Sequence, residues 1–159
     1  MTPTLYVLTG LPGSGKSWHA RQIVETTGAA YVAMDHEVHA RGLSLVDYEA
    51  RFALQPEVEA RIPVLLDAGR SVVAEFGSWT REERDRLRSL AEESDARTQL
   101  WFVDAPLELC RERILARGGM GAQELAGAVL DSSRDLFERP SSDEAAQYGS
   151  YRYIGVSAS

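Results

Sequence analysis

The strongest constraint on this chain is an eight-residue segment near its start, Gly10-Leu11-Pro12-Gly13-Ser14-Gly15-Lys16-Ser17. It fits the pattern G-x-x-x-x-G-K-S in full. The segment follows an apolar run, Leu5–Leu8, and precedes residues 16–27, whose apolar positions have helical spacing. A strand, a glycine-rich turn and a helix in this order form the context in which the pattern binds phosphate. The alternative is a glycine-rich turn with no ligand.

Each part of this pattern has a chemical reason. The glycines let backbone N–H groups approach phosphate oxygens closely, and the following helix adds unpaired N–H groups and its positive dipole end. Lys16 would reach the β- and γ-phosphates of a nucleotide, and the Ser17 hydroxyl would bind Mg²⁺. Lys16 is also the only lysine among 17 basic residues. The predicted nucleotide-binding residues are consecutive: Gly10, Leu11, Pro12, Gly13, Ser14, Gly15, Lys16, Ser17 and Trp18.

Short apolar runs and helical stretches alternate along the rest of the chain. Strands are predicted at residues 5–8, 30–34, 71–74, 99–103 and 152–156. Helices are predicted at residues 16–27, 44–69, 80–93, 104–117 and 122–137, with a short capped one at 141–144. The helix at 44–69 is expected to hinge at Pro56 and to bend at Pro63. This alternation predicts an α/β fold, a parallel sheet covered on both faces, in a single domain over residues 1–159.

Two acidic residues follow predicted strands. Ligands of such sheets bind outside the carboxyl ends of the strands, where Asp35 and Glu75 lie. Asp35 could accept the proton of an attacking hydroxyl, and Glu75 could orient a Mg²⁺-bound water or a substrate hydroxyl. The alternatives are a helix N-cap or turn aspartate for Asp35 and a solvated strand-end glutamate for Glu75.

An arginine-rich helix end forms a candidate lid. Arg113 and Arg117 lie four residues apart, on one helix face, and Gly118-Gly119-Met120-Gly121 follows them. Arginine stabilises charge on a transferring phosphoryl group, and the glycines would provide a hinge. Nothing in the sequence provides a partner that would hold this hinge still. The alternative is a solvated surface helix whose arginines pair with its own acidic residues.

Composition narrows the classes of partner. The net charge of −7 disfavours nonspecific binding to nucleic acid or to anionic membranes. No apolar run approaches the ~20 residues that span a bilayer. The segment that begins Met-Thr-Pro-Thr has no basic patch or long apolar core, so we expect no signal peptide there. The single cysteine, Cys110, cannot form an internal disulfide, so a reducing cytoplasm is the expected compartment. His19, His36 and His39 form no metal-ligand pattern, and the oligomeric state is not predicted.

Taken together, several segments resemble a known family. They are Gly10–Ser17, Asp35, Val72-Val73-Ala74-Glu75, Thr80–Arg84, Val103–Glu108, Arg113 with Arg117, and Phe137–Glu144. The chain resembles AAA-type P-loop kinases, a family that includes polynucleotide 5′-kinase-like, chloramphenicol phosphotransferase-like and zeta-toxin-like enzymes. The resemblance implies a three-layer α/β/α P-loop NTPase fold of the nucleoside-monophosphate-kinase type, with a five-stranded parallel sheet and a short lid. It also implies ATP with Mg²⁺ and phosphoryl transfer to a hydroxyl group.

The same resemblance implies the residue roles. Lys16 and Ser17 would hold phosphate and Mg²⁺, Asp35 would be the base, and Arg113 and Arg117 would belong to the lid. Because no substrate domain is inserted, the expected acceptor is a small molecule with a hydroxyl group, bound between residues 36–62 and 76–81. Two alternatives stay open: a regulatory or binding ATPase without such an acceptor, and a kinase acting on a nucleic-acid 5′-hydroxyl.

Overall fold

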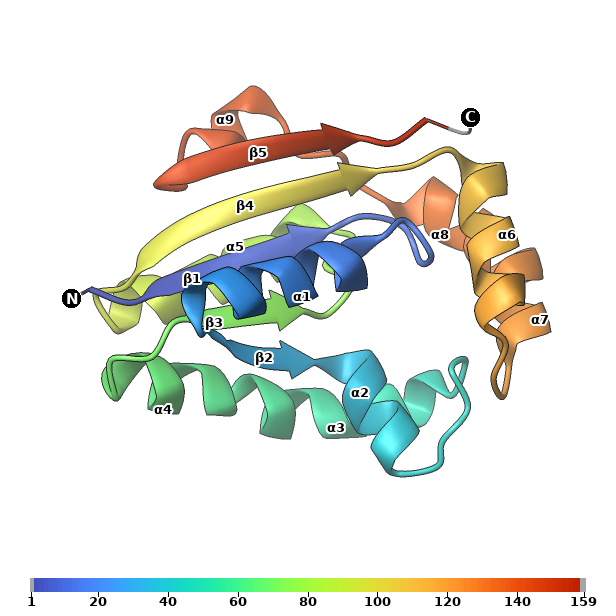
Figure 1. Cartoon of the computed structure of the whole chain (residues 1–159), viewed down its shortest axis with the longest axis horizontal. Helices are drawn as coiled ribbons and strands as arrows, with labels where there is room; N and C mark the ends of the chain where they lie inside the picture. Colours follow the sequence, from blue (N-terminus) through green and yellow to red (C-terminus); the bar gives the residue numbers. More distant parts are fainter. Residues whose placement is uncertain (1, 158–159) are drawn as a thin grey trace.

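A five-stranded parallel sheet forms the centre of the computed structural model, which describes residues 2–157 (Figure 1). The strand order is β2-β3-β1-β4-β5, and each neighbouring pair is parallel. The strands are β1 Thr4–Thr9, β2 Ala30–Ala33, β3 Val72–Glu75, β4 Arg97–Asp104 and β5 Ser150–Gly155. The predicted strands and the α/β fold class are confirmed. Met1, at the start of the segment examined for a signal peptide, lies outside the described residues.

Helices cover both faces of this sheet. They are α1 Lys16–Thr27, α2 Met34–Ala40, α3 Tyr48–Glu59, α4 Arg61–Asp67, α5 Arg81–Glu93, α6 Leu107–Arg117, α7 Ala122–Glu124, α8 Leu130–Leu136 and α9 Ser142–Ala145. Successive strand residues point to opposite faces, so Leu5 and Val7 pack with α3, α4 and α5, whereas Leu8 packs with α1. A third cluster joins α6, α7 and α8 beyond the carboxyl ends of the strands (Figure 1).

The region predicted as one hinged helix at residues 44–69 is divided differently. The helix continues through Pro56 and breaks at Ala60, between α3 and α4. Pro63 explains the position of the break, because it cannot donate a hydrogen bond to the carbonyl of Glu59. It lies instead in the first turn of α4, where a backbone N–H needs no partner.

Helix α2 was not among the predicted helices, although a helix N-cap was the alternative given for Asp35; the N-cap in the structure is Ala33. Met34 and Val38 lie one turn apart and are buried, so they anchor this short helix against the core. Asp35 and Glu37 occupy its first turn, where negative charge is favourable. Asp35 therefore lies in the first turn of a helix, two residues after the end of β2.

The helix predicted at residues 122–137 is also interrupted. A π-helical turn, Leu125–Val129, separates α7 from α8, and Gly127 within it has non-helical backbone angles (φ −92°, ψ −117°). The two predicted capping residues are confirmed: the Thr80 hydroxyl accepts from the N–H of Glu83, and the Ser141 hydroxyl accepts from that of Glu144, both at 3.2 Å.

Candidate active site

The loop between β1 and α1 has a backbone that only glycine permits at its critical positions. Gly10 and Gly13 have φ angles of 153° and 78°. A Cβ atom at Gly10 would overlap the carbonyl oxygen of Val103, and one at Gly13 would lie 2.5 Å from that of Cys110. The loop is thus packed directly against the end of β4 and the start of α6. That packing fixes the path of its backbone N–H groups.

Lys16 and Ser17 begin α1 at the end of this loop. Lys16 is buried, and its Nζ donates to the carbonyl oxygens of Gly10 at 2.6 Å and Leu11 at 3.0 Å. Burial lowers the pKa of Lys16, although the charges of Glu75 and Asp35 oppose this shift. The lysine is therefore held against the loop with two carboxylates nearby.

Glu75 connects this loop to the end of β3. Its Oε2 accepts a hydrogen bond from the Ser17 hydroxyl at 3.1 Å, and its Oε1 accepts one from the Tyr31 hydroxyl at 2.8 Å. Glu75 is buried, so it is not the solvated strand-end glutamate of the alternative interpretation. A hydroxyl and a carboxylate oxygen at this separation are the type of ligand that Mg²⁺ prefers.

The loop between β1 and α1, with Ser17 and Glu75, fits a nucleoside triphosphate with Mg²⁺. The loop sits at the N-terminus of the 12-residue helix α1, which presents unpaired backbone N–H groups. Ser14 Oγ lies within the loop, is buried, and has no hydrogen-bond partner among the described residues. A phosphate oxygen would provide that missing partner. Trp18, in contrast, is 55% exposed, and its ring packs edge-on against that of His19.

Asp35 lies beside Glu75, because Ala33 of β2 is in register with Glu75 of β3. Its Oδ1 accepts a hydrogen bond from Arg51 of α3 at 2.8 Å, and the two residues form an ion pair. Burial raises the pKa of Asp35, but the nearby Arg51, Lys16 and Arg117 charges outweigh burial and hold the pKa below its ordinary value. Asp35 is consequently ionised at neutral pH.

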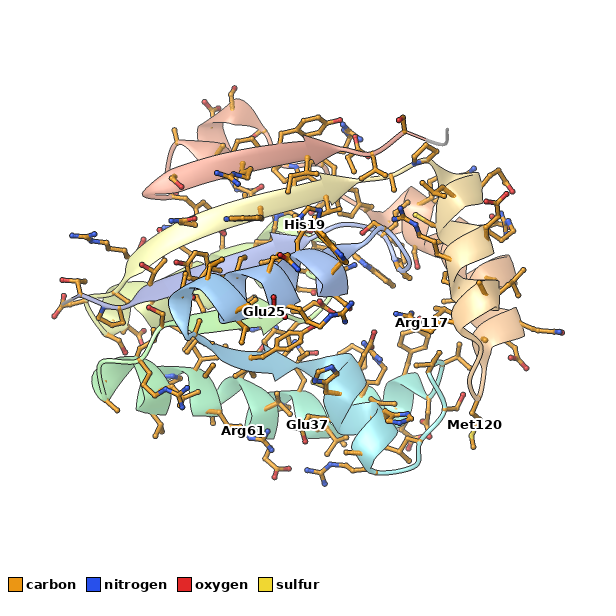
Figure 2. All side chains as sticks on the ribbon, viewed as in Figure 1. His19, Glu25, Glu37, Arg61, Arg117 and Met120 are labelled. Carbon is orange, nitrogen blue, oxygen red and sulfur yellow. The ribbon has the colours of Figure 1, made fainter. Side chains whose placement is uncertain are left out.

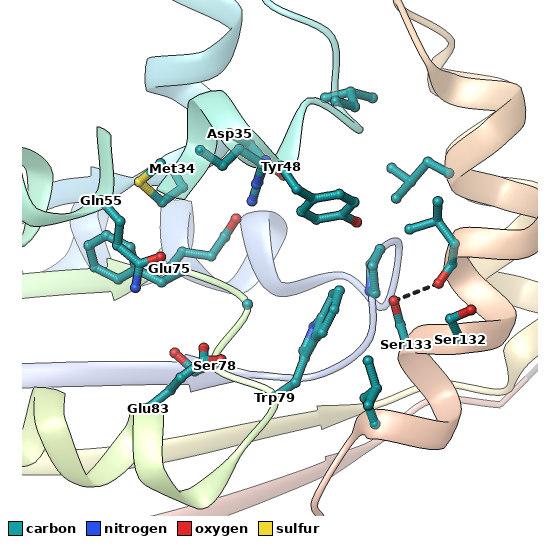
Figure 3. Close-up of a pocket in the computed structure, with 18 of the residues that line it drawn as sticks. Met34, Asp35, Tyr48, Gln55, Glu75, Ser78, Trp79, Glu83, Ser132 and Ser133 are labelled. Atoms are coloured by element: carbon teal, nitrogen blue, oxygen red, sulfur yellow. Dashed lines mark hydrogen bonds and ion pairs between the residues drawn. The ribbon is translucent and has the colours of Figure 1, made fainter. Parts of the chain in front are cut away.

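A pocket of about 570 Å³ opens in front of these groups (Figure 3). Lys16, Asp35 and Glu75 lie in its wall, so the pocket adjoins the loop. The segments predicted to line it contribute Leu45, Tyr48, Arg51, Phe52, Gln55, Phe76, Gly77, Ser78 and Trp79. Sequence reasoning missed the opposite wall, which consists of Leu125, Ala128, Val129, Ser132, Ser133 and Leu136. The helical spacing of these positions was the signal available in the sequence.

The predicted lid arginines occupy different places. The Arg113 guanidinium donates to the Ser14 carbonyl oxygen at 2.9 Å and so contacts the loop directly. Arg117 extends from the end of α6 toward the loop side of the molecule, and its charge lowers the pKa values of both Lys16 and Asp35 (Figure 2). The expectation that the glycine hinge has no partner is wrong, because the N–H of Leu45 donates to the Met120 carbonyl oxygen at 3.1 Å.

The remaining sequence expectations concern metal sites and membranes. Residues 2–157 contain no group of three or more His, Cys, Asp or Glu side chains placed to hold a metal ion. Cys110 is fully buried in the cluster formed by α6, α7 and α8. Every described helix is too short or too polar to cross a bilayer.

A parallel sheet, a glycine-rich loop ending in Lys16-Ser17, and strand-end carboxylates facing a pocket define a P-loop kinase-type fold. The chain belongs to the family described as AAA domain, whose model matches residues 5–140. It is 31% identical over 149 residues to an adenylyl-sulfate kinase of Aeromonas hydrophila, covering 87% of this chain and 74% of that protein. It is 29% identical over 139 residues to a cytidylate kinase of Ignicoccus hospitalis, covering 80% and 72%.

Solved structures agree with this fold. A gluconokinase from Sinorhizobium meliloti superimposes with a TM-score of 0.60 at 22% identity, covering 99% of this chain and 84% of that one. At this identity the similarity establishes the fold alone. The kinase-like P-loop architecture of this chain is therefore shown.

Proposed function

We propose that this protein is an ATP-dependent kinase that transfers the γ-phosphoryl group to a hydroxyl group of a small molecule. The observation that carries the proposal is the position of Asp35, whose carboxylate lines a pocket that also contains Lys16. A nucleotide site alone needs no ionised carboxylate on its far side. The relatives named as adenylyl-sulfate kinase and gluconokinase are consistent with a small acceptor.

In the proposed reaction the acceptor oxygen forms a bond to the γ-phosphorus, and the bond from that phosphorus to the bridging oxygen breaks. ADP leaves with the electron pair of the broken bond, and the hydroxyl proton passes to the Asp35 carboxylate. Phosphoryl transfer has a loose transition state, so orienting the hydroxyl matters more than strong basicity. A carboxylate with a pKa held low by Arg51 suits this orienting role.

The other predicted residues have supporting roles in this proposal. Lys16 would leave its loop carbonyls to bind phosphate, and Ser17 with Glu75 would hold Mg²⁺, which would neutralise phosphate charge. Arg113 already contacts the loop at Ser14, and Arg117 extends from the same face of α6. These two arginines would stabilise the charge on the transferring group and close the site against water.

Acceptor-stimulated release of ADP tests the proposal. The purified protein is incubated with ATP and Mg²⁺ and challenged with small alcohols, sugars and amino alcohols, and separately with a 5′-hydroxyl oligonucleotide. Stimulation by a small alcohol, abolished by chelating Mg²⁺, is the expected result. Stimulation by the oligonucleotide alone would identify a nucleic-acid kinase, and slow ADP release that no acceptor changes would identify a regulatory ATPase.

A further inference from the structure

One side of the pocket is lined by side-chain oxygen atoms, and one of these, Ser78 Oγ, is buried without a hydrogen-bond partner among the described residues. The residues are Gln55, Ser78 and Glu83, which we call the polar corner; Figure 3 shows them on the side opposite Ser132 and Ser133. Ser78 itself is 1% exposed. The Gln55 Nε2 donates to Glu59 at 2.9 Å, which leaves the Gln55 carbonyl oxygen free. A ligand group bound in this corner would supply the partner that the Ser78 hydroxyl lacks.

Glu83 contributes an unbalanced negative charge to this corner. Burial raises the pKa of Glu83, although the charges of Arg86 and Arg84 oppose that shift. Neither arginine pairs with it, since Arg86 binds Glu59 at 2.8 Å and Arg84 binds Glu144 at 2.6 Å. A partly enclosed carboxylate without an ion pair is costly, so a cationic ligand would be stabilised there.

The Arg84 guanidinium is already fully engaged. Its Nε and Nη2 donate to Glu144, Nη1 donates to the carbonyl oxygens of Ser78 and Trp79, and Nη2 also donates to that of Glu138. These bonds account for its donor groups. They also fix the backbone turn that carries Ser78, whose φ of 53° is unusual for a residue other than glycine. The polar corner is therefore preformed.

The other walls of the pocket suit an apolar body. Tyr48 and Phe52 of α3 line the pocket, as does Trp79 from the turn after β3 (Figure 3 labels Tyr48 and Trp79). Phe52 is 77% exposed and Leu136 is 62% exposed, although both line the pocket. A ligand with a ring-sized apolar part would cover these side chains and gain from their burial.

We propose that the phosphoryl acceptor is an amino alcohol with an aromatic or similarly bulky apolar body. The proposal rests on the kinase function proposed above. The hydroxyl lies at Asp35, the apolar body lies between Tyr48 and Trp79, and the ammonium group lies at the polar corner. An ammonium group has three N–H donors, which match the oxygens of Gln55, Ser78 and Glu83. A neutral polyol would leave the charge of Glu83 without compensation.

Calorimetry with matched probes tests the ligand class directly. With a nonhydrolysable ATP analogue present, 2-amino-1-phenylethanol is compared with 1-phenylethane-1,2-diol, which replaces the ammonium group by a hydroxyl. We expect the amine to bind at least about tenfold more tightly, as is typical of charge-assisted hydrogen bonds. Glu83→Gln should remove this preference. Glu82→Gln is the matched control, because Glu82 is the exposed neighbour and does not line the pocket.

Several results would overturn the proposal. Equal binding of the two probes, or no binding of the amine, would contradict it. So would a preference for the amine that persists in Glu83→Gln, provided that thermal unfolding shows this variant to be folded. ADP release with the same probes separates this inference from the kinase function. Tight binding of the amine without ADP release would support the proposed ligand class and contradict the proposed kinase function. Equal turnover of amine and diol, with no effect of Glu83→Gln, would support the kinase function and contradict the proposed ligand class.

Discussion

Arg84 and Glu144 form a fully buried, two-pronged ion pair, with Arg84 Nε 2.6 Å from Glu144 Oε2 and Arg84 Nη2 2.9 Å from Glu144 Oε1. Through its remaining donors Arg84 also holds the carbonyl oxygens of Ser78 and Trp79 in the pocket wall. The pair thus links helix α5, the pocket wall and the short helix α9. The Arg84–Glu144 pair holds the backbone of this wall in place, although neither residue lines the pocket.

Removing one member of this pair should destabilise the fold strongly. Glu144→Gln keeps the shape of the side chain but leaves the buried Arg84 charge uncompensated, so we expect a loss of about 3–5 kcal/mol in the free energy of unfolding. Urea unfolding measures this loss. The matched control is Arg134→Met, which breaks an exposed pair with Asp135 and should change stability by less than about 1 kcal/mol. Similar small losses in both variants would show that the buried pair is dispensable.

Lys16→Ala should abolish phosphoryl transfer and leave the fold intact. Losing a clamp on the transferring group costs several kcal/mol of transition-state stabilisation, so we expect turnover to fall at least about 10³-fold. ATP-dependent turnover and thermal unfolding are measured on the same preparation. Lys16→Arg serves as a second variant, because a planar guanidinium does not replace a point charge in this loop. A folded Lys16→Ala protein with near-normal turnover would contradict the assigned role.

Asp35→Asn should separate binding from chemistry. The amide keeps the size of the side chain but cannot accept a proton, so the rate should fall about 10²–10⁴-fold. ATP affinity, measured by calorimetry, should change little because the loop is untouched. Loss of ATP binding with unchanged turnover at saturating ATP would instead place Asp35 on the nucleotide side.

The pH dependence of turnover should report the Asp35–Arg51 pair. Asp35 must be ionised to act, so turnover falls as the pH drops through its pKa, which is held below its ordinary value. Arg51→Met removes the largest of the three charges that lower this pKa and leaves the burial that raises it. The acid limb of the kcat profile should therefore move to higher pH. Arg51→Lys keeps a positive charge, so the acid limb of its kcat profile should stay close to that of the unaltered protein. An acid limb that does not move in Arg51→Met would exclude an effect of Arg51 on the pKa of Asp35.

The sequence predicted well those features that local patterns encode. The glycine-rich loop, the strand-end carboxylate Glu75 and the caps at Thr80 and Ser141 depend on residues close together in the chain. Each one follows from backbone chemistry over a few residues. Their positions could therefore be read before the fold was known.

The features that sequence reasoning missed depend on tertiary packing. Arg84 and Glu144 are 60 residues apart, and neither stands out in the periodicity of its own helix. The π-helical turn around Gly127 has no local sequence signal of its own. The break at Ala60 is different, because Pro63 marks it locally and the prediction placed the hinge at Pro56 and only a bend at Pro63. The missed pocket wall around α8 packs against α6 through a buried apolar cluster, in which Leu125 and Leu130 meet Ile114. The bond from Arg111 of α6 to Asp131 at 2.9 Å adds a polar contact between the same helices.

The lid prediction concerns residues 117–122. Met120 and Gly121 are attached, by the bond from Leu45 N–H to the Met120 carbonyl and by the close packing of Gly121 on Ser44, whereas Gly118 and Gly119 have no atom near the position of a Cβ. We expect the segment to exchange amide hydrogen readily in the free protein and to be protected when a nonhydrolysable ATP analogue is bound. Hydrogen exchange measured in both states tests this ordering.

Arg117→Ala should lower kcat more than it weakens ATP binding, because a contact with the transferring group strengthens in the transition state. Arg134→Ala is the matched control, since Arg134 is exposed, pairs only with Asp135 and does not line the pocket. The kinetic constants and ATP affinity of both variants are compared with those of the unaltered protein. Equal protection of residues 117–122 with and without the analogue, together with normal turnover of Arg117→Ala, would make Arg117 an ordinary solvated charge at the end of α6.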